Sequence, residues 1–110
     1  MENNIVSELT SFIAHAPTAF HAVAELKNLL NREGFEELHE SERWEIEPGK
    51  KYYVTRNNSS IIAVKAGTDL DNYSFQATAS HSDSPSFKLK ENAEIEAAKK
   101  YTMLNTEGYG

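Results

Sequence analysis

His81 and Asp83 are the two residues whose types and spacing are best suited to chemistry. Zinc accepts a neutral imidazole as a ligand, and a neighbouring carboxylate fixes the tautomer of the ring and raises its basicity. A carboxylate two residues after a histidine is close enough to play that part. The pattern leaves two readings open: a metal ligand with its supporting carboxylate, or a structural histidine that hydrogen-bonds to its neighbours.

The residues before His81 predict a strand that carries it. Positions 73–81 alternate in character, and residues two apart in a strand lie on the same face. The face that ends at His81 would hold Phe75, Ala77 and Ala79. These small or apolar side chains indicate a buried strand, which should stop or bend at Pro85 because proline lacks an amide donor. Ligands of open α/β sheets bind at the carboxyl ends of strands, where His81 and Asp83 would lie.

Other catalytic or metal-binding constellations are weaker. A Ser-His-Asp triad needs a serine hydroxyl and a carboxylate on opposite nitrogens of one imidazole, and serines next to His81 in an extended chain point to alternate faces. The remaining histidines, His15, His21 and His39, lack the spacing of a one-face metal-binding pair. Surface or capping roles are expected for these three.

Composition limits the partners. The chain has 110 residues, enough for one small domain, and its net charge of -6 argues against a nucleic-acid partner, which needs a cationic surface. There is no cysteine, so a metal must be held by imidazole and carboxylate. No apolar run approaches the roughly 20 residues that span a bilayer, and no signal peptide is visible. No membrane association and a cytoplasmic location are therefore expected.

Two helices are expected at the start of the chain. An apolar stripe at three- and four-residue spacing predicts a first helix that ends near Ala16-Pro17. Thr18 is a suitable N-cap for a second helix, and Gly34 is a suitable stop. The stripes consist of Ile5, Leu9, Phe12 and Ile13 in the first helix and Phe20, Val23, Leu26 and Leu30 in the second.

Extended structure is expected after residue 34. Residues 35–48 are predicted to form a loop with short extended pieces in which Trp44 fills the core. Residues 51–56 and 60–66 predict a hairpin, because Asn57-Asn58 between them tolerates positive φ. Residues 87–90 alternate and predict a short strand, whereas residues 91–100 fit either a short helix or a solvated linker. The order of elements favours an α/β or α+β domain.

Taken together and in order, these segments resemble the aspartyl aminopeptidase family of dinuclear zinc exopeptidases, over nearly the whole chain. The matching segments are 16–23, 33–35, Trp44, 51–57, 59–63, 81–85 and 107–110. Ser82 stands where the family usually has threonine, so a hydroxyl is kept, and Ala19 stands where it often has proline. The specificity of the resemblance comes from the ordered set of segments.

The resemblance implies an α/β fold, the N-terminal part of a mixed-sheet catalytic domain of the zinc-exopeptidase type. Residues 1–90 would belong to that domain, and residues 91–110 would begin an inserted β-rich assembly domain. His81 would be the first zinc ligand, and Asp83 the catalytic carboxylate that clamps and polarises the site. The family's other ligands and its general base would follow Gly110. The chain also ends without a closing helix, so we expect it to be the opening part of a longer protein and to be inactive alone.

The activity implied is that of a metalloaminopeptidase with two Zn²⁺ ions per active site. Such an enzyme removes N-terminal residues, here acidic ones, from peptide substrates by zinc-activated water, and the intact protein would be a homo-oligomer. Two alternatives stay open from the residues. One is a non-catalytic module that binds a peptide or a partner through the edge of the hairpin. The other is a related zinc aminopeptidase that prefers neutral residues.

Overall fold

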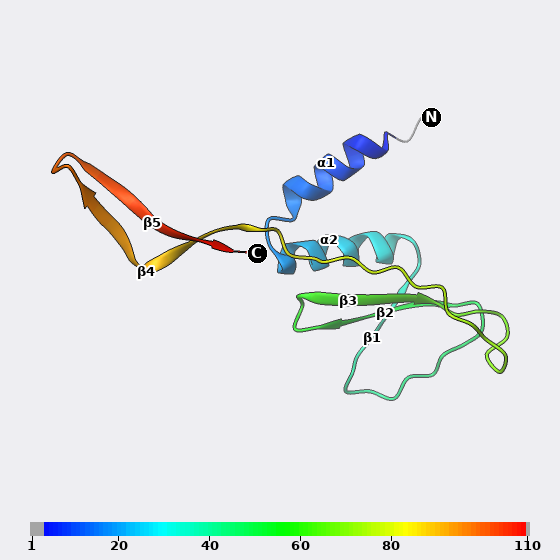
Figure 1. Cartoon of the computed structure of the whole chain (residues 1–110). Coiled ribbons are helices and arrows are strands. Elements are labelled where there is room, and N and C mark those ends of the chain that lie inside the picture. Colours follow the sequence, from blue (N-terminus) through cyan, green and yellow to red (C-terminus); the bar gives the residue numbers. More distant parts are fainter. Residues whose placement is uncertain (1–3, 110) are drawn as a thin grey trace.

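The computed structural model describes residues 4–109 and places them in two parts (Figure 1). The elements are α1 (Ile5–His15), α2 (Ala19–Arg32), β1 (Glu36–Leu38), β2 (Lys51–Arg56), β3 (Ser60–Lys65), β4 (Ser86–Ala97) and β5 (Tyr101–Tyr109). Helix α2 lies along a three-stranded sheet, helix α1 points away from that sheet, and a two-stranded hairpin projects from the other side, so the described residues extend over 70 × 41 × 21 Å. This combination of helices and mixed sheet confirms the predicted α/β class.

Both helices begin at capping side chains. The Asn4 side chain accepts a hydrogen bond from the Ser7 amide at 3.3 Å, and Thr18 Oγ1 accepts one from the His21 amide at the same distance. These bonds satisfy amides that have no partner inside the helix. After α2, Gly34 adopts a φ of +79°, which a residue without a Cβ reaches easily. The predicted helices, and the cap and stop of the second, are confirmed.

The three-stranded sheet has the order β1-β2-β3. β1 runs parallel to β2, with Glu36 opposite Tyr52, and β2 runs antiparallel to β3, with Tyr53 opposite Ala63. The three residues Asn57, Asn58 and Ser59 join β2 to β3, and Asn57 and Asn58 both have a φ of 51°. Positive φ at both central positions gives a turn whose twist matches that of the strands. The predicted hairpin is therefore confirmed.

Helix α2 is fastened to the sheet around Tyr53. Tyr53 and Val23 are each 1% exposed, and the Tyr53 hydroxyl donates to Asn31 Oδ1 at 3.0 Å, with Glu37 Oε2 a second acceptor at 3.3 Å. Lys27 Nζ lies 2.7 Å from Glu37 Oε1. The hydrogen bond from Lys27 lowers the pKa of the Glu37 carboxyl and raises that of the Lys27 ammonium. One buried ring and its polar neighbours thus join α2, β1 and β2.

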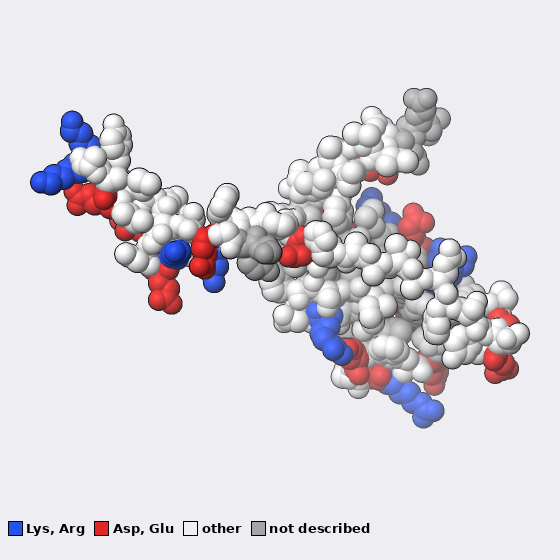
Figure 2. All heavy atoms as spheres, viewed as in Figure 1, with Lys and Arg blue, Asp and Glu red and all other residues white. Residues whose placement is uncertain are grey.

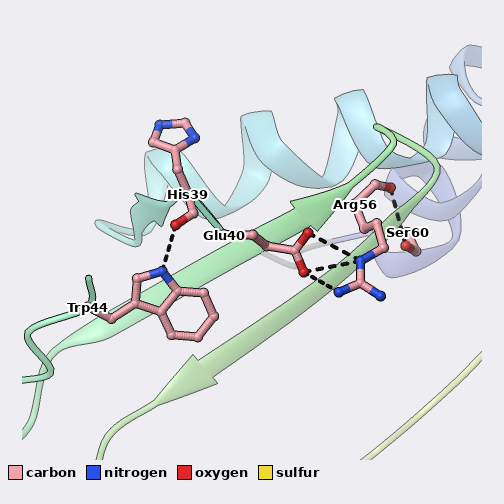
Figure 3. A network of polar contacts seen from close by, with 5 residues as sticks. All are labelled: His39, Glu40, Trp44, Arg56 and Ser60. Carbon is pink, nitrogen blue, oxygen red and sulfur yellow. Dashed lines mark hydrogen bonds and ion pairs between the residues drawn. The ribbon is translucent and has the colours of Figure 1, made fainter. Parts of the chain in front are cut away.

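The loop between β1 and β2 is braced by polar contacts (Figure 3). The Trp44 indole donates from Nε1 to the His39 carbonyl at 2.8 Å, and the Arg56 guanidinium donates to both carboxylate oxygens of Glu40. Trp44 is 44% exposed, so the prediction that it fills the core is wrong. An indole N–H needs an acceptor, and the loop supplies one at its own surface.

The strand predicted at 73–81 is absent, although the backbone there is extended. Within residues 4–109 no strand pairs with this segment, and Phe75 is 85% exposed. Tyr73 and Phe75 instead stack edge to face, with ring centroids 5.4 Å apart. A strand exists through its hydrogen-bonded neighbour, so alternation alone does not make one. The prediction of a buried strand is wrong for the part of the chain described.

The second sheet is the hairpin of β4 and β5. It contains the predicted extended residues 87–90 and continues through 91–97, where the sequence fitted a helix or a linker. The strands are antiparallel, and their register shifts between Leu89 and Glu94, which marks a bulge. Ser86 begins β4, so the strand crosses residue 90, and the domain division at 90 stays a prediction. Among the helices described, neither has the length and apolar character needed to cross a membrane.

Candidate metal site

His81 and Asp83 lie together, as the spacing predicted. His81 Nδ1 is 2.9 Å from the Asp83 carbonyl oxygen and 3.2 Å from Asp83 Oδ1. Both side chains are open to solvent, with 77% of the imidazole and 47% of the carboxylate exposed. The contact between His81 and Asp83 therefore follows from the local backbone and does not require other residues to pack over it.

The two oxygens fix which ring nitrogen carries the proton. A backbone carbonyl and a carboxylate can only accept hydrogen bonds, so Nδ1 of His81 must donate. The neutral ring then has its lone pair on Nε2. A metal-binding histidine shows this arrangement, with one nitrogen donating to a carboxylate or carbonyl and the other facing the metal. A histidine ring with this tautomer can coordinate a metal through Nε2.

Ser82 attaches this segment to the sheet. Its hydroxyl donates to the carbonyl of Ser59 at 3.1 Å, across 23 positions of sequence. Ser59 follows the Asn57-Asn58 turn, so the metal-site residues lie beside the start of β3. The Ser82 hydroxyl directs its proton to a carbonyl and not to the His81 ring, so no base activates it, in agreement with the argument against a serine nucleophile.

A cleft of about 560 Å³ lies beside His81. One wall is β3 at residues 60–63, and the other is the segment 78–84. Phe12 and Leu26 come from the two helices, and Ala16 comes from the junction between them. The sequence did not predict these helical residues as lining, because an apolar stripe on a helix ordinarily packs against the sheet. The cleft is mostly apolar with polar groups at one wall, the usual character of a small-molecule or peptide site.

The donor set suits zinc and is incomplete. Imidazole nitrogen and carboxylate oxygen are ordinary zinc ligands, but a catalytic zinc takes three ligands from protein. Within residues 4–109 no group of three histidine, aspartate or glutamate side chains could hold a metal ion. The other histidines stay local: His15 Nδ1 lies 2.7 Å from the Ser11 carbonyl and His21 Nδ1 lies 2.7 Å from Thr18 Oγ1.

Surface charge is dispersed over the face in view. Figure 2 shows basic and acidic atoms beside one another on the sheet, with a small basic group at the far end of the β4–β5 hairpin. The side-chain pairs Lys27–Glu37 and Arg56–Glu40 account for part of this mixture. Charges paired in this way add little net field at a distance.

A family profile described as "Aminopeptidase I zinc metalloprotease (M18)" matches residues 12–110. The chain belongs to the M18 family. The match covers the last residues of α1, all of α2, every described strand and the His81 site, and its last residue, Gly110, lies outside the described residues. The resemblance to aminopeptidases of this type is therefore confirmed at the level of the family.

Curated relatives match the chain over nearly all of its length. A "Probable M18 family aminopeptidase 2" of Clostridium novyi is 48% identical over 113 residues, which cover 100% of this chain and 26% of the relative. The "Aspartyl aminopeptidase" of Dictyostelium discoideum is 38% identical over 104 residues, 94% of this chain and 21% of the relative. The chain thus spans about a quarter of the length of the curated relatives it matches.

Solved M18 structures share the fold. A chain in a cryo-EM structure of the Ape4 and Nbr1 complex superposes with a TM-score of 0.75 at 39% identity, covering 91% of this chain and 19% of that one. The mApe1 dodecamer of S. cerevisiae gives a TM-score of 0.70 at 28% identity, covering 96% and 25%. These values show that the helices and strands of this chain are arranged as in the matching part of the solved M18 structures.

Proposed function

We propose that the complete protein is a zinc aminopeptidase that removes N-terminal residues from peptides. The observation that carries this proposal is the His81 ring, which Asp83 holds through Nδ1 at the edge of a cleft and whose Nε2 has no hydrogen-bond partner among residues 4–109. Membership of a family of zinc metalloproteases supports zinc as the metal. Bound zinc supplies a water of lowered pKa and polarises the carbonyl of the scissile peptide bond.

The roles of the chain's own residues follow from their contacts. His81 would hold a zinc ion through Nε2, and Asp83 would keep the proton on Nδ1 and orient the ring. The solvent-exposed imidazole leaves room for a second protein segment to bring the remaining ligands. With one imidazole and one nearby carboxylate, residues 1–110 alone would neither retain zinc tightly nor hydrolyse peptides.

Finer properties belong to the same proposal. Two zinc ions per site and a preference for acidic N-terminal residues are carried by the resemblance, and the name of the Dictyostelium discoideum relative supports the acidic preference. The dodecamer of the mApe1 structure supports assembly into a homo-oligomer. We also propose a cytoplasmic location, which imaging of the tagged complete protein would test.

The test is peptide hydrolysis by the complete protein. Release of N-terminal Asp, Glu and Leu from short peptides is measured with and without chelator, in wild type and in His81→Ala. We expect chelator-sensitive release, a preference for Asp and Glu, and loss of both zinc and activity in His81→Ala.

Each departure has a distinct meaning. A preference for Leu would replace the acidic specificity with a neutral one. If no N-terminal residue is released from any peptide with any added metal, a non-catalytic binding module is favoured. Full activity with zinc retained in His81→Ala would remove His81 from the metal site.

A further inference from the structure

Ser82 makes the one hydrogen bond described between residues 68–85 and the rest of residues 4–109. Residues 67–92 are all exposed with the exception of Ser82, which is partly buried. Within residues 68–85, the other hydrogen bonds described join residues of the segment itself, such as Asp71 to Asp69 and His81 to Asp83. The bond from Ser82 to the Ser59 carbonyl is therefore what fixes the segment against the sheet.

We propose that Ser82 is a positioning residue of the metal site, an inference that rests on the proposed function. Adjacent side chains of an extended chain point to opposite faces. Holding the Ser82 hydroxyl against Ser59 directs His81 and Asp83 to the other face, where they meet in the observed hydrogen bond. One neutral hydroxyl thus sets the place of the imidazole relative to β3.

The acceptor for Ser82 is itself held firmly. The amide of Ser59 donates to the Arg56 carbonyl at 3.2 Å and closes the turn, and Ser60 Oγ donates to the same carbonyl at 3.3 Å. The Arg56 guanidinium is in turn bound by both oxygens of Glu40 (Figure 3). The loop residue Glu40 therefore holds Arg56, and Arg56 holds Ser59. These contacts keep the Ser59 carbonyl in place as the acceptor for Ser82.

This role makes a chemical demand on position 82. The side chain must be short enough to reach the Ser59 carbonyl and must carry an O–H donor. Serine and threonine satisfy both conditions, whereas valine has the shape of threonine without a donor. Ser82→Thr and Ser82→Val therefore form a matched pair that separates the hydrogen bond from side-chain volume.

The test compares zinc binding by variants of the complete protein. Zinc affinity is measured by competition with a chelator, together with kcat and KM, in wild type, Ser82→Thr, Ser82→Val and His81→Ala. Ser74→Val is the control, because Ser74 is an exposed serine of the same segment outside the cleft lining. We expect Ser82→Val to bind zinc about 10- to 100-fold more weakly, the effect typical of outer-shell changes, and Ser82→Thr and Ser74→Val to bind as wild type.

The outcomes distinguish the two proposals. If His81→Ala loses zinc while Ser82→Val binds zinc like Ser82→Thr, the positioning role is wrong and the proposed function stands. If His81→Ala keeps its zinc, the proposed function fails and this inference fails with it. Should Ser82→Val not fold by circular dichroism, Ser82→Ala takes its place with the same expected loss, because alanine lacks the donor without adding volume.

Discussion

The β2–β3 and β4–β5 hairpins turn in the same way but are supported differently. The first turns through Asn57 and Asn58, each with a φ of 51°, and the second through Ala98 and Lys99, with φ of 51° and 56°. β2 carries two buried tyrosines, whereas apolar residues of the second hairpin are exposed. Examples are Phe87 at 79%, Tyr101 at 69% and Leu104 at 66%.

The difference shows what makes a hairpin a usable scaffold. A two-stranded hairpin is at best marginally stable in water and needs a third strand or a helix against one face. β2 has both, since β1 pairs with it and α2 is fastened to its Tyr53. β4 and β5 have only each other among residues 4–109. The candidate metal site is attached to the supported hairpin.

The largest contrast is expected from two tyrosine truncations in the complete protein. Tyr53→Ala removes a side chain that is 1% exposed and should lower the free energy of unfolding by about 3–5 kcal/mol, the usual cost of emptying a large core position. Tyr101→Ala, at 69% exposure, should cost about 0.5 kcal/mol or less. Urea unfolding measures both. Equal losses would show that the second hairpin is packed as firmly in the complete protein.

A smaller effect, dependent on pH, is expected from the carboxylate that ties α2 to the first hairpin. The pKa of Glu37 is lowered from its ordinary 4.5, so its ion pair with Lys27 stabilises the fold above pH 4.5 and is lost as pH falls through the lowered pKa. The pKa of Lys27 is raised from 10.5, so the same pair is also lost as pH rises through that raised value.

The variant Glu37→Gln should therefore cost about 0.5–1 kcal/mol near neutral pH, as for a partly exposed pair, and little below the lowered Glu37 pKa. The melting temperatures of variant and wild type, measured from pH 3 to 8, should converge at the acid end. Glu42→Gln serves as the control, because Glu42 is an exposed glutamate of the neighbouring loop. A constant gap between the Glu37→Gln and wild-type curves at every pH would contradict the ion pair.

The smallest effect is expected at the two turns. The backbone of Lys99 is in the left-handed region, which costs an ordinary L-residue about 1–2 kcal/mol. Lys99→Gly should therefore stabilise the second hairpin by about 0.5 kcal/mol, because the flexibility of glycine in the unfolded chain offsets most of the gain. Asn58→Gly should change little, since asparagine tolerates this region. Amide hydrogen exchange of β4 and β5 measures the gain. An equal gain from Asn58→Gly would contradict the contrast between the turns.

The sequence predicted features whose cause is local. Thr18 and Gly34 bound α2 through contacts within four residues, and Asn57-Asn58 supplies the turn conformation by its own preference. His81 and Asp83 likewise meet across two positions. These signals are complete in a short window, so the helices, the hairpin and the centre of the candidate site could be read directly.

Features that depend on a partner residue far away in the sequence could not be predicted from the sequence. The alternation of 73–81 suggested a strand, but a strand requires a neighbour, which residues 4–109 do not provide. Residues 91–97 became a strand because of their pairing, as where Glu94 lies opposite Leu104, despite alanine and charge that suit a helix. The acceptor for Ser82 is a backbone carbonyl 23 residues away, which leaves no mark on side-chain type.

The separation between Ser59 and Ser82 also orders events in folding. The β2–β3 hairpin closes a three-residue turn and can form within microseconds, whereas the Ser82 contact must close a loop of 23 positions at a greater entropic cost. We therefore expect β3 to form first and His81 to reach its place later. In refolding of the complete protein, pulsed hydrogen exchange would time β3 through protection of its strand amides, and zinc binding followed in parallel would time the placement of His81. Before the Ser82 contact forms, the His81 imidazole has no defined position relative to β3. Under the proposed function, zinc would therefore bind late in folding.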